Sequence, residues 1–169
     1  MNRLFLAVRP PTGVLDSLSD LPVRSAEGLR LVPPEQMHVT LRFLGDAEPE
    51  EVAAALDGFR PDEVMAHLGP RVTRLGRDAL VVPVAGLDEL AAEIGRRTTG
   101  LGDQPEGRPF RGHVTVARLR RRTPPPREWD PVDLSFEVVE VELISSTLTD
   151  QGAVHRTLST WRAGPHTRS

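Results

Sequence analysis

A short sequence pattern occurs twice in this chain and constrains the fold more than any other feature. The first copy is Met37–Phe43, MHVTLRF, and its core returns in the second half of the chain at Gly112–Arg118, GHVTVAR. Each copy reads His-Val-Thr followed by an apolar residue, and each predicts a β-strand. Chance does not easily place one pattern on two predicted strands. The repeat therefore predicts two similar lobes, each contributing one such strand.

The alternation of side chains along a strand places polar groups of each copy together. In the first copy His38, Thr40 and Arg42 share one face, and the intervening apolar residues share the other. In the second copy His113 and Thr115 share a face. An imidazole and a hydroxyl then stand about 7 Å apart along each strand. Two such strands facing one another would surround one small space with two imidazoles and two hydroxyls.

This set of side chains suits the cleavage of a phosphodiester. Two histidines can take opposite protonation states near neutral pH, one as general base and one as general acid. Threonine hydroxyls can donate hydrogen bonds to the non-bridging phosphate oxygens as their charge shifts in the transition state. A single His-x-Thr in a strand is usually structural, and it is the repetition that favours a catalytic interpretation here.

Composition narrows the class of protein. The chain has 169 residues, in the range of one domain, so residues 1–169 are expected to form a single two-lobed unit. It lacks an apolar run of about 18 residues that would span a membrane, and it has no signal-peptide cleavage pattern. The absence of cysteine excludes disulfides, thiolate metal sites and cysteine nucleophiles. We expect a soluble, cytoplasmic protein that uses no metal and no cofactor, because no His/Asp/Glu cluster has metal-ligand spacing.

The net charge of −3 hides an uneven distribution of basic residues. All 21 basic residues are arginine, and the stretch Gly107–Arg127 contains no acidic residue. Arg120, Arg121 and Arg122 directly follow the second His-x-Thr strand and are expected to line or approach one mouth of the cleft. Such a surface attracts polyanions, which favours a nucleic-acid or nucleotide ligand. The alternative is a solvated, arginine-rich loop.

Hydrophobic periodicity and turn residues predict antiparallel strands interrupted by a few helices, an α+β fold without a doubly wound sheet. Helices are expected from Thr12, as the N-cap, to Leu21, from Pro49 to Phe59, and from Leu87 to Ile94. Strands are expected at Leu4–Val8, Leu29–Val32, His38–Phe43, Arg71–Leu75, Ala79–Val84, His113–Arg118, Val138–Ile144 and His155–Trp161, with a loop at Ser145–Val154.

The chain resembles the 2H phosphoesterases, and within them the family of bacterial RNA 2′,3′-cyclic phosphodiesterases, also called the 2′-5′ RNA ligase family. Four segments carry the resemblance in the order the family has them. They are Arg3–Val8 followed by Pro10, Leu31–Gly45 with the first signature, Phe110–Arg118 with the second, and Leu143–Leu148 ahead of Gly152-Ala153. The resemblance spans most of the chain and is weak over Asp57–Val72 and Leu119–Asp133.

This resemblance implies a bilobal α+β fold with two antiparallel sheets around a pseudo-twofold cleft. It also implies metal-independent hydrolysis of 2′,3′-cyclic phosphate ends of RNA or nucleotides to 2′-phosphates. Carried onto this sequence, it assigns His38 as the proton donor to the departing 3′ oxygen and His113 as the base that activates water. Thr40 and Thr115 are similar to the phosphate-holding hydroxyls, and Arg118 to a basic residue near the phosphate.

Three further residues are candidates for binding substrate, and two positions depart from the family. Arg118 points away from His113 in a regular strand, but a strand end or bulge would re-aim it. Arg42 shares the face of the first signature, and Phe5 is a candidate for stacking on a base, with burial in the core as the alternative. Gly112 stands where many members have proline, and His155 stands where tyrosine is common.

Several functional alternatives stay open at the level of sequence. A non-catalytic module could keep the cleft for an RNA end or a nucleotide, although a binder needs donors and not a base. The same chemistry could act on a non-RNA cyclic phosphate such as an ADP-ribose derivative, or run in reverse to join ends through a 2′-5′ bond. We expect a monomer. The other histidines, His67 and His166, are expected at the surface and in a C-terminal tail.

Overall fold

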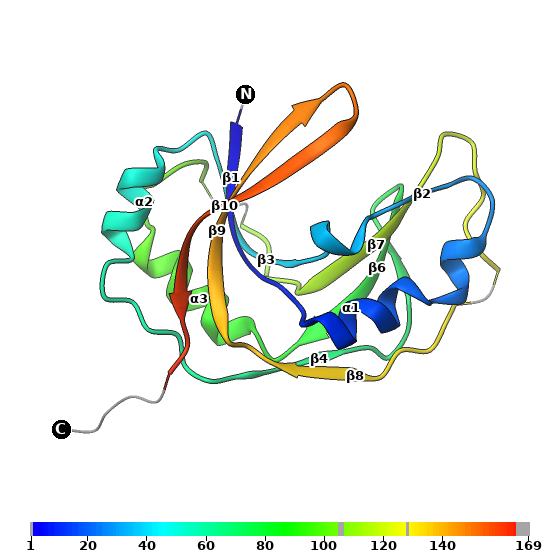
Figure 1. Ribbon diagram of the computed structural model, residues 1–169, viewed down its shortest axis with the longest axis horizontal. Coiled ribbons are helices and arrows are strands. Elements are labelled where there is room, and N and C mark those ends of the chain that lie inside the picture. The colour runs from blue at the N-terminus through cyan, green and yellow to red at the C-terminus, as the bar shows by residue number, and fades with distance from the viewer. Residues whose placement is uncertain (1, 105–106, 128, 165–169) are drawn as a thin grey trace.

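The computed structural model describes residues 2–104, 107–127 and 129–164, and His166 lies outside them. Figure 1 shows a strongly curled sheet with helices packed against it. The helices of the described residues are α1 (Thr12–Ser19), α2 (Pro49–Ala55) and α3 (Asp88–Arg97), with short 3-10 turns η1 (Pro22–Ser25) and η2 (Pro34–Gln36). The strands are β1 (Asn2–Val8), β2 (Leu29–Leu31), β3 (Val39–Gly45), β4 (Met65–Leu68), β5 (Thr73–Leu75), β6 (Ala79–Ala85), β7 (His113–Leu119), β8 (Leu134–Glu137), β9 (Glu140–Thr149) and β10 (Gly152–Arg162).

All strand pairs are antiparallel, in the order β10-β9-β1-β3-β7-β6-β4-β8, with β2 added to β7 and β5 added to β6. The expected α+β fold is therefore confirmed. The two halves of the sheet meet where β3 pairs with β7, and there only Val39 and Val114 are partners. In place of the two expected sheets, the structure has one continuous sheet whose halves are connected only by this pairing. The pairing places the two His-x-Thr segments beside one another.

Helix α3 shows why the hydrophobic periodicity succeeds for the helices. Its residues Leu90, Ala91 and Ile94 are buried, as their spacing of three and four residues predicts, and the helix contacts β3. Helix α1 begins one residue earlier than expected, because Pro11 occupies the N-cap and Thr12 is its first helical residue. No helix of the described residues has the length and apolar character needed to cross a bilayer.

The hairpin of β9 and β10 is longer than the sequence pattern predicts. Both strands continue through the expected Ser145–Val154 loop, and the turn between them is only Asp150-Gln151. The Thr149 hydroxyl donates to the Gly152 carbonyl at 2.7 Å and closes this turn. The hairpin consequently projects beyond the body of the molecule, drawn in orange in Figure 1.

Two short strands, β4 and β8, are absent from the sequence-based prediction. Each has only four residues, too few for alternation to be recognised reliably. They pair with one another, and Leu68 of β4 also pairs with Val84 of β6, so that they extend the second half of the sheet. His67 is exposed, as expected, but it lies in β4 and not in a helix or loop.

Candidate active site

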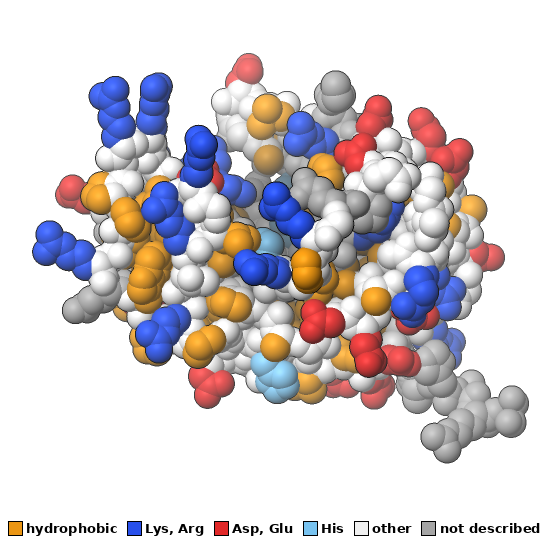
Figure 2. All heavy atoms as spheres, turned by 180° about the vertical axis from the view of Figure 1, so that it is seen from behind, with side chains coloured by type: hydrophobic (Ala, Val, Ile, Leu, Met, Phe, Trp, Pro, Cys, Tyr) orange, Lys and Arg blue, Asp and Glu red, His pale blue; other side chains and the backbone are white. Residues whose placement is uncertain are grey.

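A cleft forms where the two halves of the sheet meet. Because β3 and β7 pair only at Val39 and Val114, the residues on either side of this pair open into a shared cavity of about 540 Å³. All four signature residues line it: His38, Thr40, His113 and Thr115. Figure 2, the view from behind, shows a histidine side chain at the centre of this face with basic side chains gathered around it. The structure therefore brings together the two copies of the repeat.

Both imidazoles are held through the same ring nitrogen. His38 Nδ1 lies 2.6 Å from the carbonyl oxygen of Gln36, and His113 Nδ1 lies 2.8 Å from that of Arg111. A carbonyl can only accept a hydrogen bond, so Nδ1 carries a proton in both rings. The Nε2 atoms are thereby left to exchange protons within the cleft. Thr40 extends this arrangement, because its hydroxyl donates to His38 Nε2 at 3.1 Å when the ring is neutral.

Burial makes His38 hard to protonate. The pKa of His38 is lowered from 6.5 to about 4. Desolvation is the largest cause, and the nearby His155, Arg9 and His113 also contribute to the lowering. The hydrogen bond to the Gln36 carbonyl acts in the opposite direction. The pKa of His155 is also lowered, by burial and then by the charge of Arg9. His38 is therefore neutral at neutral pH in the free protein.

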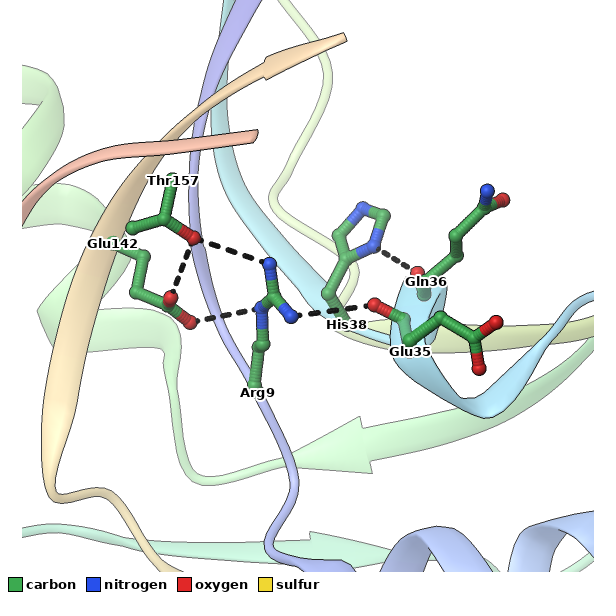
Figure 3. Close-up of polar contacts among 6 residues, drawn as sticks. All are labelled: Arg9, Glu35, Gln36, His38, Glu142 and Thr157. Carbon is green, nitrogen blue, oxygen red and sulfur yellow. Dashed lines mark hydrogen bonds and ion pairs between the residues drawn. The ribbon is translucent and has the colours of Figure 1, made fainter. Parts of the chain in front are cut away.

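A polar network centred on Arg9 supports the backbone that holds His38 (Figure 3). Arg9 Nε pairs with the buried carboxylate of Glu142 at 3.0 Å, and its Nη2 donates to the hydroxyl of Thr157 at 3.2 Å. Thr157 in turn donates to Glu142 at 2.9 Å, so the buried carboxylate is both paired and hydrogen-bonded. Arg9 Nη1 donates to the carbonyl of Glu35 at 3.3 Å. This last bond fixes η2, whose next carbonyl is the partner of His38.

A second bond fixes η2 from the opposite side. The side-chain amide of Gln36 donates to the carbonyl of Ala153 on β10 at 2.7 Å. The turn before β3 is therefore held by Arg9, which directly follows β1, and by the bond from the Gln36 amide to β10. The consequence is a defined orientation for His38, since its Nδ1 partner is the Gln36 carbonyl.

An aromatic cluster packs against His38 beneath the cleft. The ring of Phe5 stacks on His38 with centroids 4.8 Å apart, and His155 makes edge contacts with both rings at 5.5 and 5.6 Å. Phe5 is only 5% exposed, so its side chain supports the imidazole and offers no open face to a base. The burial alternative for Phe5 fits the structure. His155, by contrast, lines the cleft.

A β-bulge brings Arg118 into the cleft. In the pairing of β6 with β7, Val81 faces Thr115 and Leu80 faces Ala117, so Val116 is an extra residue. This extra residue reverses the alternation beyond it and puts Arg118 on the face of Thr115. Arg118 lines the cavity and lies 3.4 Å from the carboxylate of Asp78. The condition stated from the sequence, that a bulge re-aims Arg118, is met.

A bulge in β3 has the opposite effect on Arg42. Ala7 of β1 faces Thr40 and Leu6 faces Arg42, which leaves Leu41 as the extra residue. Arg42 therefore turns onto the core face together with Leu6, where it is 8% exposed and donates to the Leu101 carbonyl at 2.8 Å. The prediction that Arg42 shares the face of His38 is wrong, because simple alternation does not survive the bulge.

Comparison with known proteins agrees with this geometry. The family model described as LigT like Phosphoesterase matches residues 10–66. An RNA 2′,3′-cyclic phosphodiesterase from Aeropyrum pernix is 32% identical over 86% of this chain and 93% of its own length. One from Thermus thermophilus is 32% identical over 92% of this chain and 87% of its own.

The chain belongs to the LigT-like phosphoesterase family. A crystal structure of Escherichia coli LigT complexed with 3′-AMP has the same fold, with a TM-score of 0.80 at 22% identity over 97% of this chain and 99% of that one. The structure of TT0787 from Thermus thermophilus matches with a TM-score of 0.68 at 29% identity, over 95% and 97% of the two chains.

The position of Gly112 leaves no room for a side chain. A Cβ atom on this residue would lie 2.5 Å from the backbone oxygen of Val84, which is too close for a carbon atom. Glycine has no Cβ atom and fits without a shift of the backbone. The Val84 amide donates to the Gly112 carbonyl at 2.8 Å, which holds the two strands at this separation. The entry to the second signature strand is therefore closely packed.

The arginines after β7 do not line the cavity. Arg120, Arg121 and Arg122 are exposed in the turn that follows the strand, and the cleft lining contains none of them. The prediction that they line the cleft is therefore wrong. Arg30 lines it instead, and the sequence analysis did not identify this residue. Arg30 faces Arg118 across the pairing of β2 with β7. Only this pairing reveals it, because β2 has just three residues.

The network around Arg9 was also missed, although one signal points to it. Glu142 lies between the apolar residues Val141 and Leu143 of β9, and a buried carboxylate is almost never found without a partner. Its position therefore predicts a cationic partner. Among the described residues, no group of three or more His, Asp or Glu side chains is placed to hold a metal ion.

Proposed function

We propose that this protein hydrolyses 2′,3′-cyclic phosphate ends of RNA to 2′-phosphates by acid–base catalysis between His38 and His113. One observation carries the proposal. Both imidazoles donate from Nδ1 to a backbone carbonyl and present Nε2 to the same cavity, where Thr40 and Thr115 add two hydroxyls. Paired proton-exchanging atoms around a space that accepts an anion suit in-line attack at phosphorus.

In the proposed reaction His113 Nε2 takes a proton from water while the water oxygen attacks phosphorus. The bond between phosphorus and the 3′ oxygen breaks, and His38 Nε2 gives its proton to that oxygen. The products are a 3′-hydroxyl and a 2′-phosphate. The hydroxyls of Thr40 and Thr115 donate to the non-bridging oxygens, whose negative charge grows in the transition state. With the 5′-hydroxyl of a second strand in place of water, the same groups would open the cyclic phosphate to a 2′-5′ phosphodiester and a 3′-hydroxyl, which is the ligation reaction.

His38 must gain its proton from solvent when the substrate binds. Burial keeps His38 neutral in the free protein. A bound phosphate carries negative charge next to Nε2, which favours the protonated ring and offsets part of the desolvation. The same negative charge would replace the Thr40 hydroxyl as the partner of Nε2. We infer that substrate binding and protonation of His38 are coupled.

A substrate with sulfur in place of the 3′ oxygen tests the two roles. A thiolate leaves without a proton because thiols have a pKa of about 8.5, far below that of an alcohol. His38→Ala should therefore lose most of its activity on the oxygen substrate and recover it on the sulfur substrate. His113→Ala should be impaired on both. If the sulfur substrate rescues His113→Ala instead, the roles are exchanged.

The assignment to RNA is supported by the names of the relatives, which are RNA 2′,3′-cyclic phosphodiesterases. A decisive assay compares three substrates: a mononucleoside 2′,3′-cyclic phosphate, an oligonucleotide that ends in a cyclic phosphate, and an ADP-ribose derivative that carries a cyclic phosphate. The position of the phosphate in each product is determined. Absence of turnover with retained binding would favour a binding module. Addition of a chelator tests the metal-independent mechanism, for which we expect an unchanged rate.

We also propose that the protein acts as a monomer, because the four signature residues and their supporting bonds all come from one chain. Its molecular mass in solution, measured by light scattering during size-exclusion chromatography, tests this. The cytoplasmic location stays a prediction from the sequence.

A further inference from the structure

A third imidazole, that of His155 on β10, lies in the cleft without a polar partner from the protein. Its ring lines the same cavity as His38 and His113. Those two rings each donate from Nδ1 to a backbone carbonyl, whereas no hydrogen bond or ion pair holds His155 within the described part of the chain. The buried side-chain atoms that lack a partner among the described residues are Nε of Arg24 and Nε of Arg42. Both ring nitrogens of His155 are therefore open to solvent.

Packing alone holds the ring of His155 in place. Its ring meets that of Phe5 edge-on, with centroids 5.5 Å apart, and that of His38 edge-on at 5.6 Å. Phe5 and His38 are themselves stacked. Ser146, the register partner of His155 on β9, carries no charge. The cluster of three rings thus fixes His155 at the cleft and leaves its nitrogens available for a ligand.

The ionisable groups around His155 disfavour a positive charge on its ring. His38 lies against its edge, and His113 lines the same cavity. Burial and the charge of Arg9 both lower the pKa of His155. The carboxylate of Glu142 is already paired with Arg9. The free protein therefore presents a neutral ring at pH 7, which has one N–H donor and one acceptor nitrogen.

We propose that His155 is a third substrate-binding imidazole, which donates a ring N–H to an oxygen of the phosphate that lies beside His38. The inference rests on the proposed function, because that function places a phosphate between His38 and His113. Ring centres 5.6 Å apart are close enough for hydrogen bonds of about 2.8 Å from both rings to reach oxygens of one phosphate. A neutral donor at this place binds the phosphate without repelling the proton that His38 must gain.

Acid should strengthen this contact. The pKa of His155 lies below its ordinary value of 6.5 in the free protein, and a bound anion raises it again. Anion binding is therefore coupled to proton uptake, and affinity rises as the pH falls. A hydrogen bond from the charged ring is also roughly twice as strong as one from the neutral ring. Tyrosine at this position would offer an O–H donor that does not titrate until about pH 10.

The test compares His155→Phe with a matched control, His67→Phe. Phenylalanine keeps a ring to pack on Phe5 and His38 but has no nitrogen. His67 is an exposed histidine on β4, outside the cleft lining. We expect His155→Phe to raise KM for a mononucleoside 2′,3′-cyclic phosphate about tenfold, the size of one hydrogen bond to a charged group. Because the contact is made in the ground state and the transition state alike, kcat should change little. The control should change neither value.

Sulfate binding separates this inference from the proposed function, because it needs no turnover. Sulfate resembles phosphate and keeps its charge between about pH 5 and pH 8, so a change in affinity with pH reports on the protein. NMR signals of the histidine rings measure the affinity. We expect wild-type affinity to rise toward acid, His155→Phe to bind about tenfold more weakly, and His155→Tyr to lose part of the rise. Wild-type protein that binds sulfate in this way but fails to hydrolyse would contradict the proposed function and leave the contact standing.

Two results would overturn the contact. An unchanged KM and an unchanged sulfate affinity in His155→Phe would limit His155 to packing. A fall in kcat at constant KM, with a shifted acid limb of the pH profile, would make His155 a positioning residue that acts through His38. An acid-dependent rise that is equal in wild type and His155→Tyr would refute the proton uptake by His155. Circular dichroism checks the fold of each variant, and His155→Leu, which also lacks a donor, replaces His155→Phe if that variant unfolds.

Discussion

The two His-x-Thr segments share a tetrapeptide pattern and an identical mode of holding the ring, yet their surroundings differ. His38 and His113 each donate from Nδ1 to the carbonyl two residues earlier. Around the first ring the structure adds Phe5, His155 and the charge of Arg9, and burial lowers the pKa of His38 to about 4. A repeated motif therefore fixes which atoms face the cleft, and the packing around His38 makes that ring hard to protonate.

The same contrast holds for the basic residues that follow each signature. Both strands carry a bulge at the equivalent point, directly after the threonine, but Arg42 lies two residues past Thr40 and Arg118 lies three residues past Thr115. The first turns Arg42 into the core, and the second turns Arg118 into the cleft. A shift of one residue in register moves a side chain to the other face. The two copies thus share the histidine, the threonine and the bulge, and they differ in which position beyond the bulge carries the arginine.

Removal of either imidazole should have the largest effect and tests whether the two copies act as one unit. His38→Ala and His113→Ala should each lower kcat by on the order of 10²–10⁴-fold, the usual range of general acid–base catalysis. If the two rings work in the same step, the double variant should be little worse than either single one. The measurement is steady-state hydrolysis of a cyclic-phosphate-ended oligonucleotide.

The exposed histidine His67 supplies the control for this comparison. It lies on β4, where its Nδ1 contacts the Ser135 hydroxyl at 2.9 Å and no cleft residue. His67→Ala should leave the rate unchanged. Full activity of either cleft variant would remove that histidine from the mechanism, and strictly additive losses would mean that the two copies act in separate steps.

Acid should destabilise the fold through His38, because burial favours its neutral form. The pKa of His38 is about 4 when folded and about 6.5 when unfolded, so the unfolded chain binds more protons below pH 6.5. Stability from this group is complete above pH 6.5 and is lost as the pH falls toward 4. The shift corresponds to about 3 kcal/mol. Urea unfolding at pH 7 and pH 4 measures it.

The variant His38→Asn isolates that contribution, since asparagine does not titrate and all other groups stay the same. The difference in unfolding free energy between wild type and variant should shrink or reverse by about 3 kcal/mol between pH 7 and pH 4. A difference that stays constant with pH would contradict the lowered pKa of His38 in the folded protein.

Two replacements of Arg9 distinguish its effect on the pKa of His38 from its effect on the orientation of that ring. One limb of the bell-shaped profile of kcat/KM should lie near pH 4, where His38 titrates in the free protein. Arg9→Gln removes a positive charge that disfavours protonation of His38, so this limb should move to higher pH. The profile for a mononucleoside cyclic phosphate measures the shift.

Arg9→Lys is the matched variant, because it keeps the charge but loses the geometry that joins Glu142, Thr157 and the Glu35 carbonyl. Its limb should stay near pH 4 while kcat falls by roughly tenfold, since misplacement of a catalytic group is costly. Identical profiles for both variants would limit Arg9 to a role in stability.

The sequence predicts most of the elements and the four signature residues because those depend on local patterns. Alternation identifies β3 and β7, and a helical spacing identifies α3. Bulges escape such reasoning, since an extra residue in a strand depends on its neighbour's register. Arg42 was misplaced for this reason. Arg30 and Arg9 depend on contacts between segments distant in sequence, and no local pattern reports those.

The smallest expected effect belongs to the arginines that follow β7, and it sharpens the contrast between cleft and surface. Arg120, Arg121 and Arg122 are exposed in the turn and absent from the cleft lining. Screening weakens exposed charges at physiological salt, so these residues should attract RNA without fixing it. Replacing all three with glutamine should weaken oligonucleotide binding about two- to threefold at low salt, with a loss that disappears as salt is raised.

The comparison of this triple variant with Arg30→Gln and Arg118→Gln, which change the two arginines of the cleft lining, decides how the RNA runs. Cleft contacts should change mainly the dissociation rate of an oligonucleotide, whereas attraction by the exposed turn should change mainly the association rate. Stopped-flow binding of a fluorescent oligonucleotide separates association from dissociation. A triple variant that dissociates faster, with a larger loss in salt slope than the cleft variants, would place the RNA backbone along the turn. The strand would then leave the cleft past Leu119 and not across β2.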